Sequence, residues 1–273
     1  QVLHSPHVAV LLNLFPEHLD FFGTVENYYL AKINIAGFQE ADDALIYDDE
    51  NPALQSLISG MNLPARKFHM SRPEAMFDEE FVAGLTKKTR IVGQHNRKNA
   101  LAAAMACKLS GVSDEEMLHN ISSFKPLEHR LEYAGTYCGI RFFNDSISTI
   151  PESTIEALKT INDTGMLILG GFDRGLDYRN LLQYVAASNV DLVVFTGPAG
   201  RRMMTEFTPL KKEKQKMAFV ERYDELPPWM LKTPAGKACL LSPAASSYDA
   251  FENFEERGRA FKKMAETLGG SCR

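Results

Sequence analysis

Two observations predict an α/β fold with mostly parallel sheets. Short apolar runs alternate with longer segments of helical spacing along almost the entire chain. Such continuous runs are typical of strands that are buried on both faces of a parallel sheet. Lys125-Pro126 interrupts the alternation and is the best domain boundary. We therefore expect two α/β domains, 1–125 and 126–273, of which the second is a doubly wound, mostly parallel, Rossmann-like sheet.

The first predicted domain alternates between strands and helices. Its strands are expected at the apolar runs 7–14, 43–47 and 67–70. Its helices are expected at 24–38, 52–58, 96–109 and from Ser113 onward, whereas 77–86 is compatible with either structure. Thr24 and Ser113 are typical N-cap residues, and Glu116 occupies the position of the acid in a capping box.

The second predicted domain begins with a hairpin that turns at Cys138-Gly139, between strands 131–134 and 140–143. Four further strands follow, at 166–169, 192–195, 217–220 and 238–241. The intervening helices are expected at 151–158, 179–187, 199–207, near Asp224 and over 249–268. A Ser-rich turn separates the last strand from the last helix. Because the first N–H groups of a helix are unpaired, this junction predicts an anion site.

The charge and hydropathy of the chain exclude two classes of partner. The formal net charge is -5, which gives no electrostatic reason to expect nucleic acid or an anionic membrane. No apolar run approaches the length of a membrane-spanning helix. We therefore expect neither a nucleic-acid nor a membrane partner.

Polar residues follow the first predicted strand in the segment Asn13-Leu-Phe-Pro-Glu-His18-Leu-Asp20, and Tyr28-Tyr-Leu-Ala-Lys32 lies on the next helix. Open α/β sheets place their ligands at the carboxyl ends of strands. Taken alone, a histidine at this point is more often structural than catalytic. A lysine on a helix, likewise, is usually a solvated side chain.

The segment Gly93-Gln-His-Asn96-Arg-Lys-Asn99-Ala precedes an alanine-rich helix. One interpretation is a capped core helix, which the composition favours. The other is a nucleotide contact, because the Asn96 and Asn99 amides lie one turn apart and can both donate to and accept from a purine edge.

Charged residues also follow the strand ends of the second domain. Asp145 ends a strand and could cap the helix that Pro151 opens. Arg174 follows the pair Gly170-Gly171 and could bind a carboxylate with two parallel hydrogen bonds.

Together these segments resemble the Mur ligase family, in the same order along the chain. The family patterns are N-x-x-x-[DE]-H-[LM]-D with a following A-K, then G-x-H-N-x-x-N-A, an Arg at the domain boundary, an Asp-Ser strand end and a Gly-Gly turn. The segment Leu241-Ser-Pro-Ala-Ala-Ser-Ser-Tyr248 is similar to the last strand-turn-helix of the family. The resemblance covers essentially the whole chain and implies a partial P-loop-type central ATPase domain followed by a glutamate-binding C-terminal domain.

The resemblance implies a role for each candidate residue. His18 and Lys32 would be the catalytic pair that holds Mg²⁺, with Lys32 carbamylated to supply an anionic oxygen. ATP would be bound by Asn96, Asn99, Arg130 and Asp145. The substrates would be bound by Asn13, Thr149, Arg174, Ser247, Tyr248 and Phe254.

The implied enzyme is an ATP-dependent acid–amino-acid ligase of bacterial peptidoglycan synthesis. It would add D-glutamate to UDP-N-acetylmuramoyl-L-alanine through an acylphosphate, with ATP and Mg²⁺ as cofactors. We expect a monomer in the bacterial cytoplasm. No G-x-x-x-x-G-K-[ST] motif occurs, so the chain is expected to begin inside the central domain and to be inactive alone.

One departure from the family leaves alternatives open. Ile147 stands where glutamate-adding members carry a lysine, so L-glutamate is an alternative substrate. A relative of folylpolyglutamate or cyanophycin synthetases would share the His18 and Lys32 segments, although the Ser247-Tyr248 ending argues against it. A non-catalytic nucleotide-binding or scaffold module is the third alternative, because the phosphate-binding loop is missing.

Overall fold

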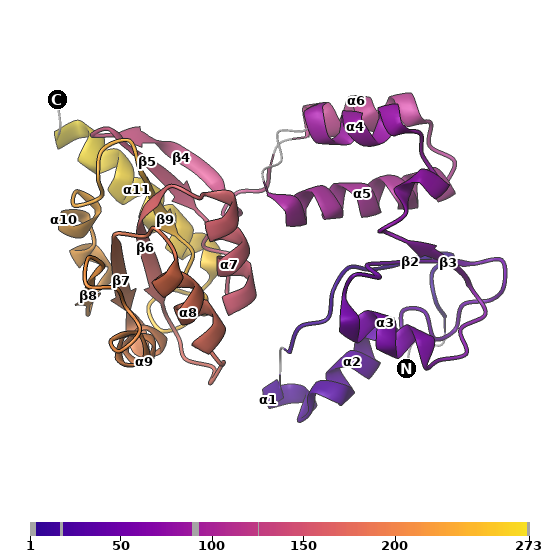
Figure 1. Ribbon diagram of the computed structural model, residues 1–273, viewed down its shortest axis with the longest axis horizontal. Coiled ribbons are helices and arrows are strands. Elements are labelled where there is room, and N and C mark those ends of the chain that lie inside the picture. Colours follow the sequence, from indigo (N-terminus) through magenta and orange to yellow (C-terminus); the bar gives the residue numbers. More distant parts are fainter. Residues whose placement is uncertain (1–3, 17–18, 89–92, 125, 272–273) are drawn as a thin grey trace. The chain divides into compact units, whose positions relative to one another are not determined.

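The computed structural model describes residues 4–16, 19–88, 93–124 and 126–271 (Figure 1). The chain divides into two compact units, Gln1–Lys125 and Pro126–Arg273. Both units are of mixed α/β type and each is built on a sheet with parallel strands, as the sequence predicts. No helix in these described ranges combines the length and the apolarity that crossing a membrane requires.

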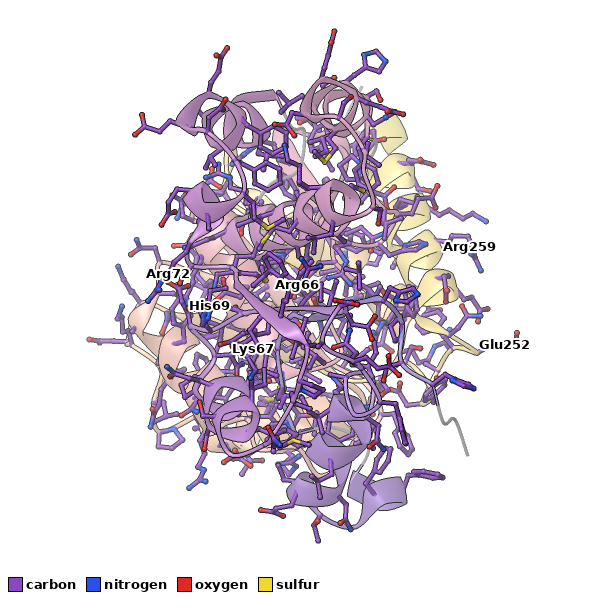
Figure 2. All side chains as sticks on the ribbon, turned by 90° about the vertical axis from the view of Figure 1, so that its right-hand side faces the viewer. Arg66, Lys67, His69, Arg72, Glu252 and Arg259 are labelled. Atoms are coloured by element: carbon purple, nitrogen blue, oxygen red, sulfur yellow. The ribbon has the colours of Figure 1, made fainter. Side chains whose placement is uncertain are left out.

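The first unit contains a three-stranded parallel sheet in the order β1-β2-β3. Its strands are β1 (Val8–Leu11), β2 (Ala44–Tyr47) and β3 (Arg66–His69). Its helices are α1 (Leu19–Phe22), α2 (Val25–Ile33), α3 (Pro52–Ser59), the 3₁₀ helix η1 (Pro73–Ala75), α4 (Glu79–Lys88), α5 (Gln94–Leu109) and α6 (Asp114–Ser123). β3 is an edge of this sheet, and its exposed Arg66 and Lys67 (Figure 2) are the kind of side chain that discourages edge-to-edge pairing.

The central strand β2 is buried on both faces, which explains its continuous apolar sequence. Leu45 and Tyr47 join a cluster that includes residues of α2 and α3. Ile46 points to the opposite cluster, which α4, α5 and α6 complete. Helices therefore cover both faces of the sheet, although it has only three strands.

Two predicted helix caps are confirmed in this unit. Thr24 Oγ1 accepts a hydrogen bond from Asn27 N at 3.1 Å, and Ser113 Oγ accepts one from Glu116 N at 3.3 Å. The ambiguous segment 77–86 is mostly helical as part of α4. Its start is fixed because Asp78 Oδ1 accepts a hydrogen bond from Phe81 N at 2.8 Å.

The second unit is a six-stranded sheet in the order β4-β5-β9-β6-β7-β8. Its strands are β4 (Glu132–Tyr137), β5 (Ile140–Asn144), β6 (Thr164–Gly170), β7 (Leu192–Thr196), β8 (Lys216–Val220) and β9 (Ala238–Leu241). Its helices are α7 (Pro151–Thr160), α8 (Arg179–Ala187), α9 (Gly197–Phe207), the 3₁₀ helix η2 (Tyr223–Glu225), α10 (Pro227–Met230) and α11 (Phe254–Ser271).

The predicted hairpin pairs β4 and β5 in antiparallel orientation, whereas the other pairs of named strands that the structure describes in this sheet are parallel. Its turn residues Cys138 and Gly139 both have positive φ, at 52° and 73°, as a two-residue hairpin turn requires. β9 is inserted between β5 and β6 and pairs in parallel with both. The carboxyl ends of these three strands are therefore neighbours.

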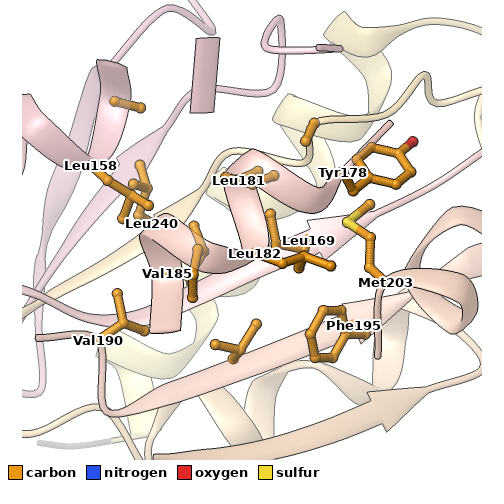
Figure 3. Close-up of a cluster of buried hydrophobic side chains, with 14 of the residues drawn as sticks. Leu158, Leu169, Tyr178, Leu181, Leu182, Val185, Val190, Phe195, Met203 and Leu240 are labelled. Atoms are coloured by element: carbon orange, nitrogen blue, oxygen red, sulfur yellow. The ribbon is translucent and has the colours of Figure 1, made fainter. Parts of the chain in front are cut away.

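Successive residues of the central strands point to opposite faces of this sheet. Leu167 and Leu169 of β6 belong to the core under α7, α8 and α9, which Figure 3 shows in close-up. Met166 and Ile168 belong to the second core, to which α10 and α11 contribute. Helices thus cover both faces, as expected for a sheet whose strands carry unbroken apolar runs.

The predicted start of the last helix is wrong. Asp249 lies in a turn, where Ala250 N and Phe251 N donate to Ser247 O at 3.1 and 2.9 Å. α11 begins five residues later than predicted, because Asn253 Oδ1 accepts a hydrogen bond from Glu256 N at 2.8 Å and so caps the helix. The Ser-rich turn is therefore separated from the helix N-terminus.

Candidate functional site

The first candidate region follows the carboxyl end of β1. Asn13 is exposed in the segment after this strand, and Lys32 is half-buried in the last turn of α2. Tyr29 Oη donates to Leu14 O at 3.5 Å, which ties α2 back to the segment that carries Asn13. The Lys32 ammonium lies 4.9 Å from the ring centroid of Tyr28. The elements that carry Asn13 and Lys32 are therefore held together.

The predicted metal ligands are only partly described. His18 lies outside the described residues. Among the residues that are described, no three His, Cys, Asp or Glu side chains gather as a metal site. The pairing of His18 with a carbamylated Lys32 stays a prediction.

Asn96 and Asn99 lie in the first turns of α5. The helix begins after Gly93, which has a positive φ of 95° and offers no side chain for capping. Asn96 is buried and Asn99 is exposed. The two amides are three residues apart and so lie near each other on the helix surface.

Sequence reasoning missed Lys98, which lies between these two residues. Lys98 Nζ is 2.9 Å from Asp48 Oδ2 and 2.7 Å from Glu50 Oε2. Although partial burial lowers the pKa of Lys98, the hydrogen bonds to Glu50 and Asp48 hold it above its ordinary value. The available signal was the acidic turn after β2, whose carboxylates are candidate partners for a cation that is distant in the sequence.

In the second unit, Asp145 immediately follows β5 and is only 3% exposed. Its Oδ1 accepts a hydrogen bond from Leu131 N at 3.1 Å, and its Oδ2 accepts one from Ser242 Oγ at 2.7 Å. Burial raises the pKa of Asp145 to about 6 in spite of these hydrogen bonds. The capping interpretation is wrong, since Ile150 occupies the N-cap position of α7 without a side-chain bond.

The Arg130 loop is folded against Asp145. Its neighbours His129 and Leu131 have positive φ values of 64° and 45°, which is unusual for side chains of this kind. Asn144 Nδ2 donates to His129 Nδ1 at 2.8 Å and holds one side of the loop. The positive charge of Arg130 moderates the raised pKa of Asp145. The structure therefore brings Arg130 and Asp145 together.

Thr149 and Arg174 also meet. Arg174 Nη2 donates to the carbonyl oxygen of Thr149 at 3.0 Å. Arg174 Nε is buried and has no hydrogen-bond partner among the described residues. The preceding Asp173 is bound instead by Arg202, with two hydrogen bonds of 2.8 Å that lower the Asp173 pKa. Asp173 therefore does not neutralise Arg174.

The Ser-rich turn after β9 packs beside the loop that follows β6. Phe172 N donates to Ser246 O at 2.9 Å. Ser247 is buried in this turn, whereas Tyr248 is exposed.

Phe254 is half-buried, and its ring meets His129 edge-on at 6.1 Å. Ser247 and Phe254 thus belong to the same edge of the sheet as Asp145, while Tyr248 points to solvent.

Arg257 is a second residue that sequence reasoning missed. It is 2% exposed, and its guanidinium donates to Ser146 Oγ at 3.0 Å, Ser146 O at 2.8 Å and Ala245 O at 3.1 Å. These bonds tie the turn after β5 to the turn after β9. The signal was a charged residue on the face of α11 that also carries Phe254 and Phe261.

Comparison with known proteins gives a consistent result. The sequence model of one protein family, the Mur ligase middle domain, matches residues 1–107. The UDP-N-acetylmuramoylalanine–D-glutamate ligase of Limosilactobacillus fermentum is 34% identical over 98% of this chain and 60% of that protein. The protein of the same name from Latilactobacillus sakei is 31% identical over 97% of this chain and 60% of its own length. The chain thus spans about three-fifths of the curated relatives that it matches.

Solved structures share the fold at low sequence identity. The MurF ligase from Thermotoga maritima in complex with ADP superimposes with a TM-score of 0.69 and 16% identity, over 98% of this chain and 64% of that one. E. coli FolC in complex with DHPP and ADP gives a TM-score of 0.62 and 15% identity, over 98% and 62%. These likenesses establish the fold alone.

Proposed function

We propose that the chain belongs to the Mur ligase family and that the protein containing it joins D-glutamate to UDP-N-acetylmuramoyl-L-alanine at the expense of ATP. The observation that carries the substrate assignment is the 34% identity to a D-glutamate ligase, which extends over 98% of the chain. In this proposal residues 1–125 are part of the central ATP-binding domain. Residues 126–273 are the glutamate-binding C-terminal domain. The protein would act as a monomer in the bacterial cytoplasm.

Asn96 and Asn99 would contact the adenine, and Arg130 would face the phosphates of ATP. Asp145 supports this role of Arg130, because its carboxylate accepts the N–H of the next residue, Leu131. A loop with two residues at positive φ is costly to hold, so a buried acceptor that fixes it contributes directly to orientation.

The reaction would run in two steps. A carboxylate oxygen of the alanyl group attacks the γ-phosphorus of ATP, which releases ADP and leaves an acylphosphate. The amine of glutamate then attacks the acyl carbon, the bond to the phosphate oxygen breaks, and inorganic phosphate and a proton leave. Arg174 would bind a glutamate carboxylate, with Thr149, Ser247, Tyr248 and Phe254 lining the same site. Holding both substrates in place supplies proximity and excludes competing water.

Mg²⁺ would be held by His18 and by Lys32 as its carbamate, with Asn13 on the adjacent segment binding substrate. The donor set suits the ion, because a carbamate offers an anionic oxygen of the kind that a hard cation prefers. Lys32 is half-buried in the last turn of α2, which is tied to the Asn13 segment. The ion would neutralise phosphate charge during phosphoryl transfer.

Ile147 motivates a second candidate substrate, L-glutamate. Ile147 lies between Asp145 and Thr149, and its N–H donates to His129 O at 3.2 Å, so its backbone lies beside the Arg130 loop. An apolar side chain cannot pair with the carboxylate of glutamate or with phosphate. The arrangement of the remaining cations then decides which enantiomer is accepted.

The test is incorporation of labelled glutamate by the complete protein, with UDP-N-acetylmuramoyl-L-alanine and ATP. We expect label in the UDP-linked product with D-glutamate and none with L-glutamate. Incorporation of L-glutamate alone would replace the proposed substrate. Incorporation of neither, with nucleotide binding retained, would favour a non-catalytic nucleotide-binding protein.

A further inference from the structure

We propose that Lys98, Asp48 and Glu50 form an ionic clasp that positions the start of α5, and with it Asn96 and Asn99, for binding the adenine of ATP. The inference rests on the proposed role of the two asparagines as adenine contacts. Lys98 itself is a positioning residue, because it acts through the helix turn rather than by touching the nucleotide. We refer to these three residues as the Lys98 clasp.

The first reason is the charge at the start of α5. A helix N-terminus favours negative charge, yet the first turn of α5 contains no acidic residue. Instead the first turn carries His95 and Arg97, Lys98 follows directly, and Gly93 supplies no side-chain cap. This helix start is therefore poorly stabilised by its own sequence. The carboxylates that favour it come from the turn after β2.

The second reason is that the acidic turn is fixed to the sheet. Asp48 N donates to Leu11 O at 3.0 Å, which continues the pairing of β2 with β1. Asp48 Oδ1 accepts a hydrogen bond from Glu50 N at 3.1 Å. Asn51 N donates to Asp48 O at 3.1 Å, and Asn51 Oδ1 caps α3 by accepting a hydrogen bond from Leu54 N at 3.0 Å. The clasp therefore joins α5 to a hydrogen-bonded turn at the carboxyl end of the central strand β2.

The third reason is the partial burial of the pair. The side chain of Asp48 is 12% exposed and that of Lys98 is 35% exposed, whereas Glu50 lies mostly in solvent. A pair shielded in this way is less weakened by water and salt than a fully exposed one. Lys98 is also one residue from Asn99 and two from Asn96, so a shift of its anchor would displace both amides.

The same helix provides a matched control. Lys108, in the last turn of α5, pairs with Asp114 at 2.6 Å, and both side chains are 37% exposed. This pair links α5 to the start of α6, six residues further along the chain. It lies at the opposite end of the helix from the asparagines. Its removal should therefore cost some stability and leave the adenine contact unchanged.

The experiment compares the variants Lys98→Met, Lys98→Arg and Lys108→Met in the complete protein. For Lys98→Met we expect the KM for ATP to rise about three- to fivefold with kcat within about twofold, as loss of about 1 kcal/mol of partly shielded charge pairing predicts. Lys98→Arg should restore most of the affinity. Lys108→Met should leave the KM for ATP within about twofold of the parent value.

Two results would overturn the clasp. One is an unchanged KM for ATP in Lys98→Met, whether or not its melting temperature falls, since that would make the pair purely structural. The other is an equal rise in KM for Lys108→Met, since that would reflect general destabilisation. If Lys98→Met does not fold, Glu50→Gln replaces it, because Glu50 is largely exposed and its loss should raise the KM for ATP in the same direction.

Asn99→Ala separates this inference from the proposed function. If Asn99→Ala raises the KM for ATP while Lys98→Met does not, the clasp is wrong and the adenine assignment stands. If neither variant changes the KM for ATP, the adenine assignment is wrong and the clasp fails with it. If both raise the KM, the two inferences are supported together.

Discussion

The two units hold their candidate site residues by different physical means. At the start of α5, the asparagines are stabilised by partly exposed side chains of opposite charge, Lys98 with Asp48 and Glu50. At the ends of β5 and β9, Asp145 and Arg257 are almost fully buried and bind hydroxyl and backbone groups. The first arrangement depends on charge pairing, whereas the second depends on several hydrogen bonds among buried groups.

The two arrangements differ in the free-energy cost of placing charged groups in the fold. Burying a charge is costly unless each of its hydrogen bonds is made. The raised pKa of Asp145 reflects that cost. The Lys98 clasp avoids it by leaving Lys98 and Glu50 partly in water. We therefore expect changes in the second unit to have larger effects than changes in the first.

The largest effect is expected from Gly170→Ala. Gly170 has a φ of 115°, and an added Cβ would overlap the carbonyl oxygen of Thr196. Because both the conformation and the space forbid a side chain, the second unit should lose about 4 kcal/mol or more of stability. Gly175→Ala is the control, since Gly175 also has a positive φ, of 73°, but faces open space. Equal free energies of unfolding for the two variants, measured in denaturant, would contradict this prediction.

Arg257→Met should be the next most damaging change. It leaves two buried carbonyl groups and the Ser146 hydroxyl without their donor, so we expect a loss of about 3–5 kcal/mol. Arg259→Met is the control, because Arg259 is exposed on the same helix (Figure 2). The loss should be nearly independent of salt. Equal stability of the two variants in urea would mean that the buried network does not hold the two turns.

Asp145→Asn should change how stability depends on pH. The folded pKa of about 6 lies above the ordinary aspartate value of 3.8, so the folded state binds more protons between these values. The contribution of Asp145 to stability therefore falls as pH rises from about 4 to about 6, by up to about 3 kcal/mol. Asparagine does not titrate, so the stability of the variant relative to the parent should increase over this window. A pH-independent difference in the free energy of unfolding would refute the raised pKa.

The smallest effect is expected from Lys98→Met on stability. Loss of the clasp should cost about 1 kcal/mol at low salt, because the pair is only partly shielded from water. High salt should reduce this loss, whereas it should leave that of Arg257→Met unchanged. Melting temperatures of both variants at two salt concentrations measure the contrast. Equal salt dependence would remove the distinction between the two regions.

Much of the fold could be predicted because its signals are local. Helix 179–187 and strand 238–241 were predicted with the bounds that the structure gives, since apolar spacing marks them. The caps Thr24 and Ser113 were also predicted, because a cap and its partner are three residues apart. The start of α11 was predicted wrongly, because Asp249 and Asn253 are both suitable caps and only the fold selects Asn253.

The site was harder to predict because its partners are distant in the sequence or belong to the backbone. Asp145 was interpreted as a possible helix cap, yet it binds Ser242 and the N–H of Leu131. The role of Lys98 depends on Asp48, which is 50 residues away. Family resemblance supplied the candidate residues, whereas the structure supplied the contacts that hold them.

The most direct test of the proposed ligation is the release of inorganic phosphate by the complete protein. The account predicts sustained release when ATP, UDP-N-acetylmuramoyl-L-alanine and glutamate are all present, with one phosphate for each amide bond formed. Omission of any one substrate should abolish turnover. Equal phosphate release without glutamate, or no release with all three, would contradict the proposed reaction.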